Sequence, residues 1–454
     1  MRITPLLLIL VSQAATADVL TVVDISQSDA AQVEHLKQRP AGGWWLEMGM
    51  HLVLAGAAAD DDDVASMAGP QAIVARYADV DPEQLMLRAR DCTEHSPPAG
   101  RLLASGGRFE LREVLPAERQ ALHLEESHAW MPVTPNATLA RQYRLDAGDA
   151  RQAPDPAVQQ LVDRIDSTRW FADVQTLASW DRSSYGGASL VAARDWIRGQ
   201  FNALGLADGL HAFNMSAPGG GSITRHNVTG AWTGGSQPDR WLIVGAHYDS
   251  RNSTLSSTVN APGAEDNASG CAGVIELARA LLPARPSHSI LFVCYAGEEQ
   301  GLLGSAAHVQ SLNQAGELPQ MDAVVIMDMI GYSSNASLEA LYESSASHTS
   351  YLAQFGAAAA TYVPALTVLT STNPFGSDHV PYLNAGVRTV LAIENDWDIY
   401  PHYHRSTDTP ANMGPQAQAM GAAILKTNAA VIAGIAGLDA GAEAVFADGF
   451  EPAQ

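Results

Sequence analysis

The amino-acid sequence predicts an α/β fold: a mostly parallel, mixed sheet flanked by helices, preceded by an N-terminal pro- or accessory region. Uninterrupted apolar runs occur near residues 241, 290, 323 and 389, and such runs are typical of strands that are buried on both faces. Segments with apolar residues at helical spacing lie between these runs. Strands that alternate with helices in this way build a largely parallel sheet.

The predicted elements of this domain follow one another from residue 158 onward. Helices are predicted, in chain order, over residues 158–178, 187–204, 270–282, 301–312, 347–360 and 416–434. Strands are predicted over residues 241–244, 290–293, 323–327 and 389–393. The last helix closes the domain, which we place at residues 156–436.

The N-terminus resembles a secretory signal, which we place at residues 1–17. Arg2 supplies a positive charge, residues 5–11 form a short apolar core, and Ala15 and Ala17 form an A-x-A cleavage pattern. A buried N-terminal strand is the alternative. No later uninterrupted apolar run approaches the ~18 residues that span a bilayer. The sequence therefore predicts a secreted or periplasmic protein that is not embedded in a membrane.

Residues 18–155 are broken into short pieces by polar and Pro/Gly turns, and they contain no catalytic constellation. The acidic run 60–63 lacks the alternating pattern of a calcium-binding loop, so we expect a solvated turn there. This stretch is predicted to be a propeptide or an accessory domain, and the sequence leaves both open. Residues 437–454 form an Ala-, Gly- and acid-rich tail that we expect to be disordered or loosely docked.

Charge and cysteine content narrow the possible partners and cross-links. The formal net charge of −23 argues against nucleic acid or an anionic membrane as a partner, and a monomer is expected. Three cysteines do not make a disulfide scaffold, and the odd number leaves at least one thiol outside any intramolecular bridge. Cys271 and Cys294 lie inside apolar runs and are predicted to be small buried hydrophobic residues.

Polar residues after the first apolar run suggest a metal site. His247 and Asp249 point the same way in an extended chain, so Asp249 would accept the second N–H of His247 and fix its tautomer. A core histidine beside a capping aspartate is the alternative. Asp266 follows in a polar turn that opens a helix, where it would either bridge two ions or cap the helix.

The later runs end in further candidates. Glu298 and Glu299 repel each other unless a cation relieves them, so one would bind metal while its neighbour acts as a general base; a solvated helix N-terminus is the alternative. Asp328 lies among apolar residues, where a metal or a salt bridge would offset its burial. In the loop around His402 and His404, either imidazole would serve as a ligand, or both would lie on the surface.

Two imidazoles and three carboxylates suit two zinc-like ions that share one bridging group. The motifs together resemble those of the M28-type co-catalytic zinc peptidases, in which aminopeptidases are prominent. This resemblance covers about residues 167–436 and rests on residues 247–250, 265–270, 297–305, 328–329, 377–379, 404 and 408.

The resemblance implies a zinc-peptidase/phosphorylase-like fold and assigns roles to residues. One metal would take His247, Asp266 and Asp328. The other would take Asp266, Glu299 and His404, which the resemblance favours over His402. Glu298 would be the general base, and Asp249 would orient His247. Residues 371–376 lack the cysteine and tyrosine that some secreted members carry, so no side chain is assigned to the oxyanion.

The implied function is that of a secreted metallo-aminopeptidase with two Zn²⁺ per chain, acting on the N-termini of peptides or proteins. Glu298 would take a proton from the attacking water and return it to the leaving amine. Cobalt or manganese would suit similar ligands. A carboxypeptidase or a single-zinc glutaminyl cyclase on the same scaffold, or a non-catalytic binding module, are the alternatives. The sequence contains no H-E-x-x-H and no G-x-S-x-G motif.

Overall fold

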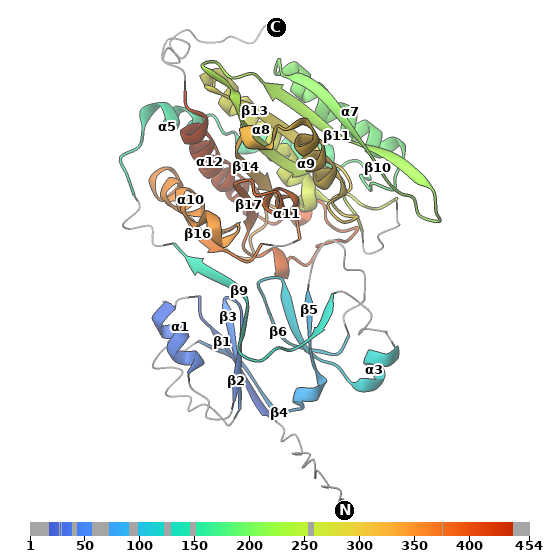
Figure 1. The fold of residues 1–454 in the computed structure, drawn as a ribbon, viewed down its shortest axis with the longest axis vertical. Coiled ribbons are helices and arrows are strands. Elements are labelled where there is room, and N and C mark those ends of the chain that lie inside the picture. The colour runs from blue at the N-terminus through green and yellow to red at the C-terminus, as the bar shows by residue number, and fades with distance from the viewer. Residues whose placement is uncertain are drawn as a thin grey trace, which may run out of the picture. The chain divides into compact units, whose positions relative to one another are not determined.

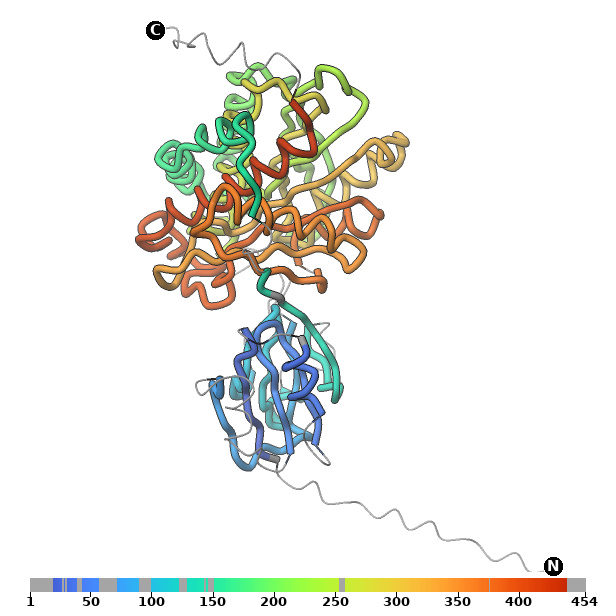
Figure 2. The backbone as a smooth tube through the Cα atoms, turned by 90° about the vertical axis from the view of Figure 1, so that its left-hand side faces the viewer, coloured from blue at the N-terminus to red at the C-terminus, as the bar shows by residue number. Residues whose placement is uncertain are grey.

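A computed structural model describes residues 18–438 apart from 27, 29, 39–42, 57–71, 90–98, 122–128, 146–150, 253–257 and 375. The predicted signal segment, the acidic run 60–63, Cys92 and the tail after residue 438 lie outside the described residues. The chain divides into two compact units, the first ending at Ala140 and the second beginning at Arg141. In Figure 2 the first unit is coloured blue to turquoise and the second green to red.

The N-terminal unit is built mainly from antiparallel strands. Its elements are β1 Asp18–Asp24, α1 Ala30–Lys37, β2 Trp44–Gly49, β3 His51–Gly56, β4 Ile73–Val80, η1 Pro82–Gln84, β5 Leu85–Ala89, β6 Arg101–Gly106, β7 Phe109–Glu113, α3 Pro116–Ala121, β8 Trp130–Pro132 and the start of β9 Ala137–Arg144. One sheet has the order β2-β3-β1-β4 and the other β6-β7-β5-β8. Sequence reasoning predicted only short pieces here.

Alternation along β1 explains the layers of this unit. Leu20 and Val22 belong to a core that both sheets share, whereas Val23 packs with Val33 and Leu36 of α1. Successive side chains of a strand point to opposite faces, so the sheet that contains β1 is covered by the second sheet on one face and by α1 on the other. Whether this unit is a propeptide or an accessory domain stays a prediction.

The second unit contains a large mixed sheet with the strand order β10-β11-β13-β12-β14-β17-β15-β16 (Figure 1). Its strands are β10 Ala207–Ser216, β11 Ser222–Trp232, β12 Gln237–His247, β13 His288–Tyr295, β14 Met321–Met327, β15 Leu338–Glu343, β16 Leu366–Ser371 and β17 Thr389–Glu394. The last residues of β9 pair antiparallel with β16. Neighbouring strands β13, β12, β14 and β17 run parallel. β10 and β11 run antiparallel to their neighbours, and β15 runs antiparallel to β17 but parallel to β16.

This sheet confirms the predicted α/β class and its mostly parallel, mixed sheet. The four predicted strands are the central ones, β12, β13, β14 and β17, because only strands buried on both faces show an unbroken apolar run. The hairpin β10–β11 and the pair β15–β16 were not predicted. β10 lies at the edge of the sheet and alternates exposed and buried positions toward its end, so it carries no such run.

Helices surround the sheet of the second unit. They are α5 Pro156–Asp163, α6 Ser167–Leu177, α7 Ala188–Ala203, α8 Gly270–Leu281, α9 Leu303–Ala315, α10 Thr349–Tyr362, α11 His379–Asn384 and α12 Ala417–Ala436. Short helical turns are η3 Ala264–Ser269, η4 Leu282–Ala284, η5 Leu318–Gln320, η6 Ala346–His348, η7 Trp397–Ile399 and η8 Pro410–Asn412. The single helix predicted over 158–178 is divided into α5 and α6, because the Asp166 side chain accepts hydrogen bonds from Thr168 N and Arg169 N and so begins a new helix.

The two faces of the sheet carry different helices (Figure 1). Val244 and Ala246 of β12 belong to the main core, together with residues of α8 and α12. On the other face, a Cβ at Gly245 would lie 2.7 Å from the ring of Tyr295, whose hydroxyl is hydrogen-bonded to that of Tyr382 of α11 at 2.6 Å. By length and apolar composition α12 would be long enough to cross a bilayer, but most of it is buried inside this unit, as in the core helix of a globular domain.

Close packing of α12 against Trp170 gives a first testable prediction. A Cβ at Gly421 would lie 2.3 Å from the Trp170 ring, which is fully buried and held by a hydrogen bond to Ser269 O. We expect Gly421→Ala to lower the free energy of unfolding by about 1–3 kcal/mol through overpacking, outweighing the ~1 kcal/mol gain in helix propensity. Urea denaturation measures this change.

Gly434 in the same helix is the matched control. It is exposed, and a Cβ there meets no atom of the described residues within 4 Å. Gly434→Ala should therefore raise the free energy of unfolding by roughly 0.5–1 kcal/mol. Two shifts of the same sign would mean that contact with Trp170 does not decide the outcome.

The cysteine prediction needs a correction. Cys271 at the start of α8 and Cys294 in β13 were expected to be separate buried residues, but the structure joins them in a disulfide with a Cα–Cα distance of 5.9 Å. Both are fully buried, as predicted. The bridge was missed because a helix and a turn separate the two residues in sequence, and only packing of α8 on β13 brings them together.

Candidate metal centre

The predicted site residues gather where the central parallel strands end. His247 is the last residue of β12, Asp328 directly follows β14, and Glu298 lies just after β13. Because these strands are parallel neighbours, their carboxyl ends lie at one edge of the sheet. Asp266 lies in η3, between β12 and α8, and His404 lies in the loop between β17 and α12.

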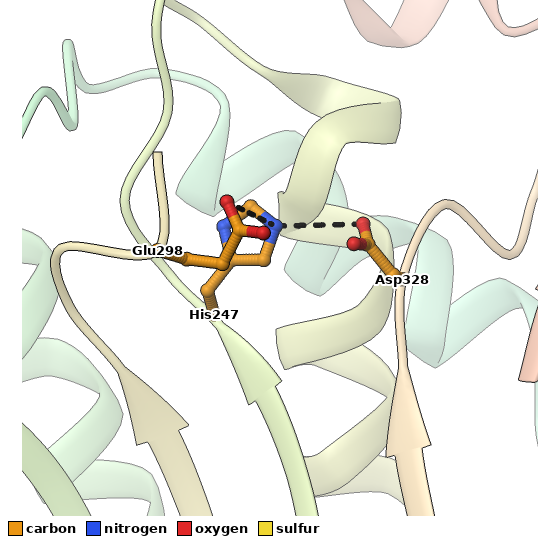
Figure 3. Close-up of side chains that lie close together, drawn as sticks. All are labelled: His247, Glu298 and Asp328. Carbon is orange, nitrogen blue, oxygen red and sulfur yellow. Dashed lines mark ion pairs between the residues drawn. The ribbon is translucent and has the colours of Figure 1, made fainter. Parts of the chain in front are cut away.

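The first group of side chains surrounds the imidazole of His247. Its Nε2 atom lies 3.3 Å from Asp266 Oδ1 and 3.4 Å from Asp328 Oδ1. Figure 3 shows the same nitrogen between the carboxylates of Glu298 and Asp328, with Glu298 Oε2 at 3.8 Å. A nitrogen and several carboxylate oxygens therefore converge on one point from different loops.

The second group surrounds His404. Its Nε2 atom lies 2.9 Å from Asp266 Oδ2 and 3.2 Å from Glu299 Oε2. Asp266 is thus common to both groups, with one carboxylate oxygen toward His247 and the other toward His404. This is the placement that a group bridging two ions requires. His402, the alternative left open by the sequence, instead lies 2.9 Å from the Thr407 hydroxyl through its Nδ1 atom.

The donor atoms fit a pair of divalent cations. His247 Nε2, Asp328 Oδ1 and both carboxylate oxygens of Glu299 are buried and make no hydrogen bond within the described residues. Leaving such groups without partners is costly, and zinc prefers imidazole nitrogen together with carboxylate oxygen. The three ligand atoms of His247, Glu298 and Asp328 lie within 4.8 Å of one another, as do those of Asp266, Glu299 and His404.

The electrostatics of the centre are those of crowded, buried charges. Burial acts to raise the pKa of Asp266, but the nearby imidazoles of His247 and His404 outweigh it and hold that pKa below its ordinary value. Burial also raises the pKa of Glu298 well above its ordinary value, with His247 opposing and Asp328 adding to the rise. Burial and the neighbouring carboxylates therefore favour the protonated form of Glu298.

Asp249 holds His247, but not through the expected atom. The Nδ1 atom of His247 lies 3.1 Å from the main-chain oxygen of Asp249 and 3.7 Å from its carboxylate. The carboxylate instead accepts from the Ser184 hydroxyl at 2.9 Å and from Glu298 N at 3.3 Å. Asp249 thus orients the imidazole with its main chain and fixes the loop of Glu298 with its side chain, because the turn after β12 rotates the carboxylate toward that loop.

Asp408 supports the segment that carries the bridging residue. Its carboxylate accepts from the main-chain N–H groups of Glu265 and Asp266 at 2.9 and 3.0 Å, and from the Tyr400 hydroxyl at 2.8 Å. Burial raises the pKa of Asp408 to about 7. Asp408 thus holds the backbone of the loop that carries Asp266.

Several supporting residues were not singled out in the sequence. The Ser377 hydroxyl donates to Asp328 Oδ2 at 2.7 Å, and Asn267 accepts from Met329 N at 3.2 Å. Ser184 bridges Asp249 to Gly297 N, which lies 2.8 Å from its hydroxyl. Ser377 and Asn267 belong to the motifs that carry the family resemblance, so a signal existed for them. Ser184 lies in a loop without a motif, and nothing in the local pattern marks it.

Comparison with known proteins identifies the class. Residues 227–428 match peptidase family M28, which confirms the resemblance seen in the motifs. This matched region contains all five predicted metal ligands and Glu298.

Individual relatives agree with this assignment. A probable zinc metalloprotease of Pyricularia oryzae is 33% identical over 201 residues, which cover 41% of this chain and 39% of that protein. Leucine aminopeptidase 1 of Arthroderma otae is 28% identical over 269 residues, covering 56% of this chain and 70% of that protein. The chain spans less than half the length of the probable zinc metalloproteases that it matches.

A solved structure extends the likeness in fold. LapB from Legionella pneumophila has a TM-score of 0.52 and 20% sequence identity, with 92% of this chain and 99% of LapB covered. At this identity the likeness concerns the fold alone. Its coverage exceeds the second unit, so the likeness includes part of the N-terminal unit.

Proposed function

We propose that this protein is a zinc aminopeptidase with two zinc ions per chain. The observation that carries the proposal is the placement of Asp266, whose two carboxylate oxygens face His247 at 3.3 Å and His404 at 2.9 Å. His247 and Asp328 would hold one ion, and Glu299 and His404 would hold the other, with Asp266 shared. The match to peptidase family M28 and the names of the relatives support zinc as the metal.

The side chains of the centre suit hydrolysis of a peptide bond. When bound, the zinc pair supplies a water nucleophile and polarises the scissile carbonyl. Glu298 accepts the proton of the attacking water, because its carboxylate faces the first group and burial raises its pKa. The same carboxyl group then returns the proton to the leaving amine. Asp249 keeps the loop of Glu298 in place through Glu298 N.

An aminopeptidase is favoured over the other reactions that this scaffold could support. The similarity to leucine aminopeptidase 1 supports cleavage at N-termini. A glutaminyl cyclase with a single zinc ion would need only one of the two groups, and both are present. A non-catalytic binding module would not need Glu298, which is 2% exposed and whose carboxylate lies 3.8 Å from His247 Nε2. A carboxypeptidase would release residues from the C-terminus, so the cleavage products distinguish it from an aminopeptidase.

We also propose that the enzyme works outside the cytoplasm, as a monomer and on peptide or protein N-termini. The signal-like N-terminus supports export. The Cys271–Cys294 disulfide supports it independently, because disulfides persist in oxidising compartments. The net charge of −23 supports a partner other than nucleic acid or an anionic membrane.

The direct test uses a panel of aminoacyl anilides and peptides on the purified chain. We expect release of N-terminal residues from free peptides, no cleavage of peptides with an acetylated N-terminus, and loss of activity after chelation. Stoichiometric zinc should restore activity. Cleavage of acetylated peptides from the C-terminus would establish a carboxypeptidase, and activity that persists in the metal-free protein would refute a zinc mechanism.

A further inference from the structure

The loop between α6 and α7 contains a buried cation that neither the motifs nor the family match includes. Arg182 in this loop is 0% exposed, and it precedes the matched region, which begins at residue 227. Burial lowers the pKa of its guanidinium to about 10. The side chain is therefore still charged at neutral pH, although it lies wholly inside the protein.

Arg182 donates only to main-chain carbonyls among the described residues. Nε donates to Tyr248 O at 2.7 Å, and Nη2 donates to Gly263 O at 2.6 Å. Nη1 donates to Leu177 O at 2.6 Å and to Pro262 O at 2.5 Å. A buried cation normally pairs with a carboxylate. Here the fork of donors instead joins three backbone segments that are far apart in sequence.

Two of those segments carry metal ligands. Tyr248 directly follows His247, and Gly263 lies at the start of the turn that carries Asp266. The main chain of Arg182 joins the same segments, because Ser250 N donates to Arg182 O at 3.2 Å and Arg182 N donates to Ala261 O at 3.4 Å. One residue thus links the end of β12 to η3 through both its side chain and its backbone.

The charge of Arg182 acts on the centre as well. The carboxylates of Asp408, Asp249, Asp266 and Glu299 all interact electrostatically with it. Since no single carboxylate neutralises the guanidinium by direct contact among the described residues, its charge is shared by this group. A fixed positive charge near four carboxylates lowers their mutual repulsion when no cation is bound.

We propose that Arg182 is a positioning residue for the metal centre: it sets the spacing between His247 and Asp266 before metal binds and offsets the repulsion among the surrounding carboxylates. This inference rests on the proposed zinc function. Arginine is required because the main-chain carbonyl groups accept from different nitrogens of one planar guanidinium group. The ammonium group of lysine has a single nitrogen and cannot reach all of these acceptors.

The test compares zinc affinity with stability in Arg182→Lys and Arg182→Met. Zinc affinity is measured by competition with a chromophoric chelator, and stability by the melting temperature of the metal-free protein. We expect Arg182→Met to weaken zinc binding by about 10–100-fold, the usual effect of removing a group that orients ligands. Arg182→Lys should keep the positive charge but lose the planar set of donors, so its zinc affinity should lie between those of Arg182→Met and the wild type. At saturating zinc, kcat should fall more than KM changes.

Arg279→Met is the matched control. Arg279 is also largely buried and joins helices through Asp173 and Gln200, at 2.5 and 2.8 Å, but it holds no segment that carries a ligand. Its loss should lower the melting temperature and leave zinc affinity within two-fold of the wild type.

The other possible results would overturn either the positioning role of Arg182 or the proposed zinc function. Folded Arg182 variants with wild-type zinc affinity would overturn the inference. Variants that stay unfolded even at saturating zinc would also overturn it, because zinc binding should offset a defect confined to ligand spacing. A wild-type chain that binds no zinc would instead refute the proposed function, so the two failures are distinguishable.

Discussion

Replacing Glu298 by glutamine is expected to lower kcat by about 10²–10⁴-fold, the range that a general base contributes, while zinc content stays unchanged. The substitution keeps the size of the side chain and removes only its ability to accept a proton. Glu298 Oε2 lies farther from His247 Nε2, at 3.8 Å, than Asp266 and Asp328 do at 3.3 and 3.4 Å. This is the order expected if Glu298 faces the reacting water and the aspartates bind metal.

The experiment measures kcat and zinc per chain on the same preparation. Glu298 also lies within the group of possible ligand atoms around His247, so loss of zinc from Glu298→Gln would reassign it as a ligand. Glu276→Gln is the matched control: Glu276 is equally buried but bonds Arg169 at 2.6 and 2.9 Å, away from the centre. It should lower stability and leave kcat unchanged.

Replacing Asp266 by alanine is expected to remove both zinc ions and abolish activity. Its two oxygens face different imidazoles, at 3.3 and 2.9 Å, so a single substitution removes a ligand from each half of the centre. It also leaves the remaining carboxylates, Glu299 and Asp328, without the shared group that holds the two ions together. Zinc content after dialysis at fixed free zinc measures the effect.

Single-half variants provide the comparison. Asp328→Ala should lower the affinity for the ion beside His247, and His404→Ala should lower the affinity for the ion beside Glu299. Each variant should therefore retain about one zinc ion under conditions in which Asp266→Ala retains none. The melting temperature of each metal-free variant serves as a check on folding. Two tightly held zinc ions in Asp266→Ala would show that the carboxylate does not bridge.

Much of the second unit could be predicted from local pattern. The strands β12, β13, β14 and β17 are recognisable because burial on both faces demands an unbroken apolar run. The candidate ligands follow such runs, as at His247 and Asp328, because the ends of parallel strands are the one place where polar groups meet. In the N-terminal unit, β4 and β6 mix exposed and buried positions and so carry no such run. β3 does have four consecutive buried apolar residues, 52–55, but this run was not identified as a strand.

The sequence by itself determined the fold class, the resemblance to peptidase family M28 and the set of candidate metal ligands. Only the tertiary structure decided which atoms meet: the two oxygens of Asp266 facing different imidazoles, the main chain rather than the carboxylate of Asp249 on His247, and Arg182 between two ligand segments. Periodicity reports how a segment is buried, which is a local property. Contacts between loops depend on how whole strands and helices pack, and that information is spread over the entire chain.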